Sequence, residues 1–285
     1  MLSFQDPRLV LPEGGSQDRM QVGAGVAAMR KSPSADATQV SQVLFGETVI
    51  LHHEDGDFGL VQAEADRYVG WVLMEALSSP ILEPTHQIKV GRLHTYAEPK
   101  ISGAPQFVLG TGAQLTATGQ TQGRYIEFER AGWIVDHLVA PADYPEEDPV
   151  TVAERFLNTP YLWGGRDCLG VDCSGLVQVA FAVCGVEAPR DSDMQQAWLG
   201  EAIPDWQTPG ALRRGDMVFW KGHVGLMADP ETLLHANGTF MTTMTEPFKP
   251  AIARIANEYG EPLEARRVNI SAERGVKPDW LTALA

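Results

Sequence analysis

The 285-residue sequence predicts an α+β domain with an antiparallel sheet, preceded by two small β-barrels. Short strand-like runs recur through the first half of the chain. An acidic, proline-bearing stretch, residues 141–149, then marks a change of pattern. Beyond it, helical patterns come first and strands joined by short turns follow, as in α+β domains. We therefore expect an arm at 1–20, barrels at 21–80 and 84–141, and a third domain at 142–285.

The two barrels are predicted from a shared rhythm and a shared ending. A Gly-Trp-aliphatic sequence closes each of them, as Gly70-Trp71-Val72 and as Gly132-Trp133-Ile134. The two copies lie about 60 residues apart, a spacing that indicates an internal repeat. The first barrel is expected to have strands at 22–29, 39–44, 47–52, 58–62 and 67–72, and the second at 88–96, 107–109, 114–117, 125–128 and 131–135.

The third domain is centred on a predicted helix, Cys173 to Cys184, which Gly185 can cap. Its residues are apolar on almost every side, so we expect it to be buried. Further helices are expected at 150–158, 193–199 and 251–259, and strands at 217–220, 222–227, 232–236 and 263–268.

Composition excludes some classes of partner. The net charge of −15 argues against sequence-independent nucleic-acid binding and against an anionic membrane surface. No apolar run approaches the roughly 20 residues of a membrane helix. Residues 1–8 lack a basic segment followed by an apolar one, which predicts a cytoplasmic protein. A mature chain with its signal removed would look the same, so export stays open.

The three cysteines differ in their surroundings. An odd, low count argues against a disulfide framework and fits a reducing compartment. Cys173 is at the predicted helix start, where backbone amides and the helix dipole favour thiolate. Cys184 is at the other end of that helix and is expected in the core, whereas Cys168 precedes the helix in a loop.

Two histidines are the candidates for a base that would activate Cys173. His223 stands between two glycines at one strand, and His235 is at the end of another in the same domain. Nucleophilic catalysis by a thiol needs such a base and a group that orients it. The remaining histidines are expected at surfaces or with structural partners: His52, His53, His86, His94 and His137.

A zinc site is the competing arrangement. Two thiols, Cys168 and Cys173, and two imidazoles, His223 and His235, could form a tetrahedral set. Their spacings fit the common zinc motifs poorly. We therefore expect no metal and no cofactor.

Six segments of the third domain form an ordered set: Pro160–Gly165, Gly170–Gln178, Pro189–Ser192 with Gln195, Leu212–Phe219, Gly222–Gly225 and Leu234–Ala236. Together they resemble the NlpC family of bacterial cell-wall cysteine peptidases, a papain-like group. Through the segment 44–49 and the two Gly-Trp endings, the barrels are similar to bacterial SH3-like domains.

This resemblance implies roles for four residues. Cys173 would be the nucleophile and His223 the general base, with His235 orienting and polarising His223. Tyr161 would lie near the oxyanion site, beside the backbone amide of Cys173.

The combination of domains resembles a subgroup that acts on murein peptides with a free N-terminal L-Ala. The implied reaction hydrolyses the γ-D-glutamyl-diamino acid bond and releases L-Ala-γ-D-Glu, a step of cell-wall peptide recycling. Asp172, Ser174 and Ser192 would contact the substrate, and Tyr68 and Glu47 would close the pocket around its amine.

Four alternatives remain open. Asp172 can equally serve the turn and the helix start. The protein can be an endopeptidase that remodels intact peptidoglycan, or a murein-binding protein without activity. The same thiol can also transfer acyl groups of another substrate.

Overall fold

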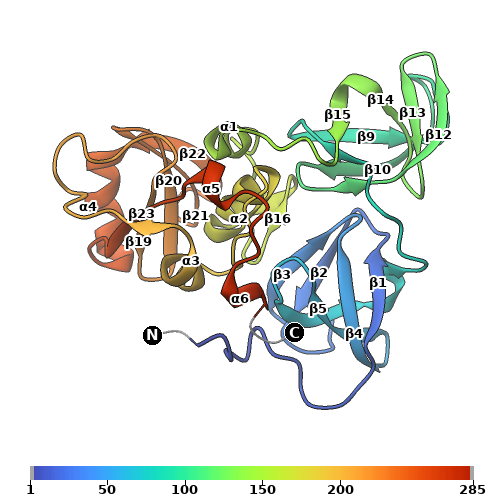
Figure 1. Ribbon diagram of the computed structural model, residues 1–285, viewed down its shortest axis with the longest axis horizontal. Helices are drawn as coiled ribbons and strands as arrows, with labels where there is room; N and C mark the ends of the chain where they lie inside the picture. Colours follow the sequence, from blue (N-terminus) through green and yellow to red (C-terminus); the bar gives the residue numbers. More distant parts are fainter. Residues whose placement is uncertain (1–2, 283–285) are drawn as a thin grey trace. The chain divides into compact units, whose positions relative to one another are not determined.

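The structure is a computed structural model that describes residues 3–282 (Figure 1). The chain forms two compact units, one of residues 5–145 and one that runs from Glu146 and includes residues 3 and 4. The boundary falls inside the acidic, proline-bearing stretch that the sequence marks as a linker. Within the described residues, no helix combines the length and the apolar character needed to cross a bilayer.

The first half of the N-terminal unit is a seven-stranded antiparallel sheet in the order β3-β2-β6-β5-β4-β1-β7. A core that includes Met29, Val49 and Val61 fills it. Its elements are β1 (Asp18–Val22), β2 (Val26–Arg30), β3 (Gln39–Leu44), β4 (Thr48–Asp55), β5 (Phe58–Ala63), β6 (Val69–Leu73), the 3-10 turn η1 (Met74–Ala76) and β7 (Leu77–Ser78).

Two of the predicted strands are wrong, because each is divided into two strands in the structure. The run 22–29 is divided between β1 and β2, and the run 88–96 is divided in the same way between two strands of the second barrel. Small apolar residues continue across the first break because the chain is packed on both sides of it. The expected arm also ends earlier, since β1 begins at Asp18; before it, Leu9 is buried and its carbonyl accepts a 2.6 Å bond from Gln62.

The second half of this unit repeats the ending of the first. In both, a Gly-Trp strand leads through one 3-10 turn into a short final strand, as β6-η1-β7 and as β14-η2-β15. Trp71 pairs with Arg30 and Trp133 pairs with Tyr96 at corresponding places. The elements are β8 (His86–Ile88), β9 (Arg92–Tyr96), β10 (Pro105–Gly110), β11 (Gln114–Leu115), β12 (Ala117–Gln122), β13 (Tyr125–Phe128), β14 (Gly132–Val135), η2 (Asp136–Leu138) and β15 (Val139–Pro141).

The strands of this second barrel form two sheets, β10-β9-β14-β13-β12 and β11-β8-β15. The segment that follows β3 of the first barrel packs against the second barrel. Phe45 lies in the apolar core of the second barrel, and its carbonyl accepts a 2.9 Å bond from the Gln114 N–H.

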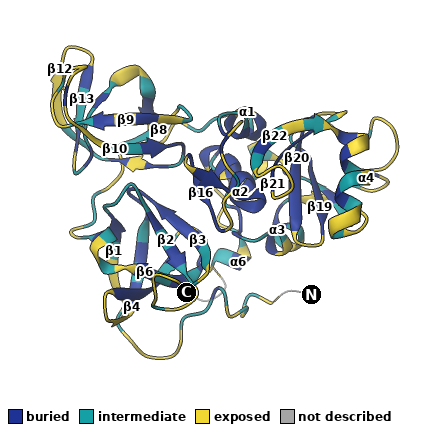
Figure 2. Cartoon of the chain, turned by 180° about the vertical axis from the view of Figure 1, so that it is seen from behind, coloured by how far each residue is buried: buried dark blue, intermediate teal, exposed yellow. Residues whose placement is uncertain are grey.

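The C-terminal unit is an α+β fold built on a six-stranded antiparallel sheet, β18-β23-β19-β20-β21-β22. Helix α2 packs on β20 and β21, and α4 packs on β21 and β22 from the opposite side (Figures 1 and 2). Its elements are α1 (Pro149–Glu154), β16 (Arg166–Asp167), β17 (Gly170–Val171), α2 (Cys173–Val183), α3 (Ser192–Trp198), β18 (Glu201–Ala202), β19 (Met217–Trp220), β20 (His223–Asp229), β21 (Thr232–Asn237), β22 (Thr242–Pro247), α4 (Phe248–Tyr259), β23 (Glu264–Arg267), α5 (Ile270–Glu273) and α6 (Asp279–Thr282).

The α+β prediction is confirmed, and the central helix α2 is almost wholly buried (Figure 2). Strand β22 was not predicted. Its sequence, Thr-Thr-Met-Thr-Glu-Pro, has one large apolar side chain before its proline, so it lacks the alternation that identifies a strand. The helix expected at 150–158 is shorter and ends at Glu154, because Asn158 and Thr159 pair with Thr243 of β22.

Candidate active site

Helix α2 positions Cys173 as its first residue. Asp172 is the N-cap, and its Oδ1 accepts a 2.7 Å bond from the Gly175 N–H. A capping carboxylate satisfies one of the backbone donors that a helix start leaves without partners. The N–H of Cys173 belongs to that same set of donors, which is what an oxyanion site requires.

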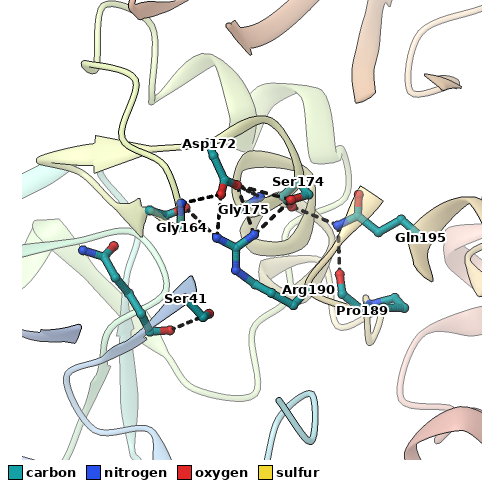
Figure 3. A network of polar contacts seen from close by, with 10 residues as sticks. Ser41, Gly164, Asp172, Ser174, Gly175, Pro189, Arg190 and Gln195 are labelled. Atoms are coloured by element: carbon teal, nitrogen blue, oxygen red, sulfur yellow. Dashed lines mark hydrogen bonds and ion pairs between the residues drawn. The ribbon is translucent and has the colours of Figure 1, made fainter. Parts of the chain in front are cut away.

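A buried ion pair fixes this helix start to the loop before it (Figure 3). Arg190 is 1% exposed and bonds both oxygens of Asp172, at 3.0 and 2.7 Å. It also donates to Ser174 Oγ at 2.9 Å, while the Gly164 N–H donates to Asp172 Oδ2 at 2.8 Å. The bidentate geometry fixes the orientation of the carboxylate as well as its charge.

Gly175 allows the helix to approach that loop closely. A Cβ at this position would lie 2.1 Å from the carbonyl oxygen of Gly165. The side chain of Gln195, on α3, continues the same support by donating to the carbonyls of Ser174 and Pro189 at 2.9 and 2.8 Å (Figure 3).

The two histidines come together on adjacent strands. His223 begins β20 and His235 lies on β21, with His223 Nε2 2.8 Å from His235 Nδ1. Gly225 gives them room, because a Cβ there would lie 3.3 Å from the Cβ of His235 and closer still to Leu233. With Nε2 of His223 engaged, Nδ1 is the nitrogen left to serve a thiol.

The thiol of Cys173 lies at the start of the same strand. The backbone N–H groups of Val224 and Ser174 donate to it. The structure thereby brings together the predicted nucleophile, the predicted base and the predicted orienting residue within one unit.

The predicted thiolate character of Cys173 is wrong for the resting site. Burial raises the pKa of the Cys173 thiol to about 12, and the charge of Asp172 adds to this, against the weaker effect of the backbone donors. Burial likewise lowers the pKa of His223 to about 3, and His235 and Arg254 act in the same direction. The helix dipole is outweighed because the site excludes water. The resting pair is therefore a neutral thiol and a neutral imidazole.

These shifts predict a loss of stability in acid. The pKa of His223 is lower in the folded chain than its ordinary 6.5, so below that pH the unfolded chain binds the extra proton. Stability due to this group is complete above pH 6.5 and is lost as the pH falls towards about 3, with a limiting slope of about 1.4 kcal/mol per pH unit. Urea titrations of the wild type and of His223→Gln between pH 4 and pH 8 measure the difference. Parallel curves for the two proteins would contradict a buried neutral His223.

Two tyrosines border the pair. The segment carrying Tyr161 runs beside β17, and the Tyr161 N–H donates to the Met241 carbonyl at 3.0 Å. Burial raises the pKa of the Tyr161 hydroxyl, and the nearby Cys173 and Asp172 raise it further, which keeps this hydroxyl a hydrogen-bond donor close to the thiol. Tyr259, at the end of α4, stacks on the His223 ring with centroids 5.4 Å apart. Tyr259 could not be identified from the sequence, because only the packing of α4 against the sheet brings it to His223.

The other predicted substrate residues are distributed over both units. Ser174 lies in the Arg190 network, and Ser192 is the half-buried first residue of α3. Glu47 and Tyr68 belong to the N-terminal unit: Glu47 Oε2 accepts a 2.8 Å bond from the Leu44 N–H, and Tyr68 directly precedes β6.

The remaining cysteines and histidines have structural surroundings. Cys168 and Cys184 are buried free thiols. His52 lies 2.7 Å from His53 between their Nδ1 atoms and 3.0 Å from the Pro12 carbonyl, while His53 and His86 make edge contacts with Trp71 and Phe128. His94 and His137 are exposed.

A thiol at a helix start, bonded by the Val224 N–H of the strand that His223 begins, is an arrangement of the papain-like fold class. Residues 158–255 match the model of the NlpC/P60 family, and residues 29–77 match that of the bacterial dipeptidyl-peptidase SH3 domain. The C-terminal unit is thus an NlpC/P60 cysteine peptidase domain, and the chain carries a bacterial SH3 domain ahead of it.

Relatives share this arrangement over most of their length. The chain is 27% identical to dipeptidyl-peptidase 6 of Lysinibacillus sphaericus, covering 75% of this chain and 86% of the relative. It is 27% identical to γ-D-glutamyl-L-lysine dipeptidyl-peptidase of Bacillus subtilis, covering 70% and 72%. An NlpC/P60 family protein from Bacillus cereus has the same fold, with a TM-score of 0.73 at 18% identity over 88% of this chain and 99% of that one.

Proposed function

We propose that the protein hydrolyses the γ-D-glutamyl-diamino acid bond of murein peptides that have a free N-terminal L-Ala, and releases L-Ala-γ-D-Glu. The main support is the similarity to two dipeptidyl-peptidases, which covers 75% and 70% of this chain. The match of residues 29–77 to the bacterial dipeptidyl-peptidase SH3 domain adds to it. The arrangement of Cys173, His223 and His235 supports the chemistry.

In the proposed reaction, Cys173 Sγ attacks the γ-carbonyl carbon of D-Glu while its proton passes to His223 Nδ1. The Cys173 N–H and the Tyr161 hydroxyl donate to the oxygen that becomes negative. His223 then returns the proton to the departing amine of the diamino acid, which leaves a thioester on Cys173. A water activated by the same imidazole hydrolyses this thioester and frees the dipeptide.

Recognition of the substrate's ammonium group is assigned to Glu47 and Tyr68, together with Ser174, Ser192 and Asp172. Both oxygens of Asp172 already accept bonds from Arg190 and from backbone N–H groups. We therefore assign Asp172 chiefly to holding the helix start, with at most a shared contact to the ammonium. Recognition of the ammonium group would restrict the enzyme to free peptides, as peptide recycling requires.

The test compares free and blocked peptides. Steady-state rates are measured on L-Ala-γ-D-Glu-L-Lys, on its diaminopimelate counterpart and on both after N-acetylation. Loss of a buried, charge-assisted contact is worth about 3 kcal/mol, so we expect acetylation to lower kcat/KM by about 100-fold.

The alternatives give different results in the same experiment. Equal rates on free peptides and on intact sacculi would replace the recycling role with that of a wall-remodelling endopeptidase. Absence of turnover on every peptide, with no selective labelling of Cys173 by iodoacetamide, would indicate a murein-binding protein.

A further inference from the structure

We propose that Glu246 is a fourth member of the catalytic relay, a positioning residue that sets the tautomer and the basicity of His223 through His235. This rests on the proposed thiol chemistry of the site but not on the identity of the peptide. Glu246 lies on β22, the strand that the sequence did not predict, and its Oε1 is 2.8 Å from His235 Nε2.

The carboxylate of Glu246 can only accept a hydrogen bond. Burial alone would raise the pKa of this carboxyl, but its bonds and charge interactions with His235 and Arg254 outweigh burial and lower it. His235 Nε2 must therefore carry the hydrogen that lies between the two residues. Asn237 Nδ2 lies 3.2 Å from the same nitrogen. The amide oxygen of Asn237 accepts from the Phe240 N–H, so this side chain turns its NH₂ group towards His235. An NH₂ group cannot accept the Nε2 hydrogen, which leaves Glu246 as its acceptor.

The tautomer of His235 determines that of His223. In its neutral form, with the hydrogen on Nε2, His235 presents a lone pair at Nδ1. His223 Nε2, 2.8 Å away, must then donate to it, which leaves His223 Nδ1 without a hydrogen. Nδ1 is the nitrogen available to the Cys173 thiol. One carboxylate thus places the base in the form that can remove the thiol proton.

Charge acts in the same direction as geometry. When His223 accepts the proton of Cys173 it becomes positive, and the negative charge of Glu246 raises the pKa of His223. Arg254, on α4, forms an ion pair with Glu246 and lowers the pKa of His223. Among the described residues, ionisable groups that contact or act on the two imidazoles are Glu246 on β22, and Arg254 and Tyr259 on α4. Glu246 and Arg254 therefore act on the base with opposite sign.

Two substitutions with opposite expected effects test the relay. The rate of Cys173 alkylation by iodoacetamide is measured from pH 2 to pH 9 in the full chain, alongside peptide hydrolysis, because the pKa of His223 is lowered to about 3. We expect Glu246→Gln to shift the acid limb of both profiles to lower pH by about half to one pH unit. The plateau rate should fall about tenfold. We expect Arg254→Met to move the acid limb upwards.

Glu258→Gln is the matched control, because this carboxylate lies on the next turn of α4 and interacts with Thr239. It should leave both limbs in place. A lower plateau with an unmoved limb in Glu246→Gln, or shifts of the same sign in Glu246→Gln and Arg254→Met, would reduce Glu246 to a structural residue and overturn the proposal. If alkylation follows the expected shifts while no murein peptide is cleaved, the relay stands and the proposed substrate fails.

Discussion

Replacement of Cys173 by alanine should lower peptide turnover by about 10⁴-fold or more, the scale seen when a covalent nucleophile is removed. The thiol is the only group of the site that can form the acyl intermediate, and the imidazoles of His223 and His235 would remain hydrogen-bonded to each other. Hydrolysis of the free tripeptide, followed by mass spectrometry of the products, measures the loss.

Cys184→Ala is the control for this substitution. Cys184 is fully buried just beyond α2, and burial raises the pKa of its thiol to about 12. Its loss removes packing at the end of the helix and should cost about 1 kcal/mol of stability with turnover unchanged. Turnover that survived in Cys173→Ala and disappeared in Cys184→Ala would reverse the assignment.

Replacement of Arg190 by methionine should have the largest effect on stability. The guanidinium is 1% exposed and satisfies a carboxylate whose side chain is 10% exposed. Removing one partner of such a pair leaves a buried charge and costs about 3–5 kcal/mol. Because Asp172 also caps α2, the helix start and Cys173 lose their support together. Chemical denaturation measures the stability, and iodoacetamide labelling measures the reactivity of Cys173.

Two further variants separate the charge from the packing. In Asp172→Asn/Arg190→Met no unpaired charge remains, so the double variant should be more stable than Arg190→Met alone. Arg214→Met, which removes a partly exposed cation paired with Asp148 and Glu154, should cost no more than about 1 kcal/mol. Equal losses in Arg190→Met and Arg214→Met would show that burial of the pair contributes nothing.

Much of the fold could be predicted from local patterns. The α+β class follows from helices that precede strands, and α2 follows from an apolar run ended by Gly185. The repeated Gly-Trp endings identify corresponding segments, β6-η1-β7 and β14-η2-β15. Sequence patterns did not predict strands that are held by tertiary packing and lack an alternation of apolar and polar residues. The polar strand β22 is held by its pairing with β21, and a glycine-bearing turn interrupts the apolar run 22–29.

Only some residues of the candidate active site could be identified from the sequence. Cys173, His223 and His235 could be identified because the family resemblance covers their segments and because a cysteine at a helix start is recognisable. Arg190 lies in one of those segments, but its role depends on a carboxylate 18 residues away in the chain. Glu246, Arg254 and Tyr259 could not be found, since only the pairing of β22 and the packing of α4 bring them to the histidines. A polar strand that contains a single carboxylate was the one available signal.

In the proposed reaction, Cys173 forms an acyl intermediate with the L-Ala-γ-D-Glu portion of a free murein peptide. Acid quenching during turnover at low temperature, followed by digestion and mass spectrometry, detects this intermediate. We expect one adduct with the mass of the dipeptide acyl group, on the fragment that contains Cys173. An adduct on Cys168 or Cys184, or an adduct that retains the diamino acid, would contradict it.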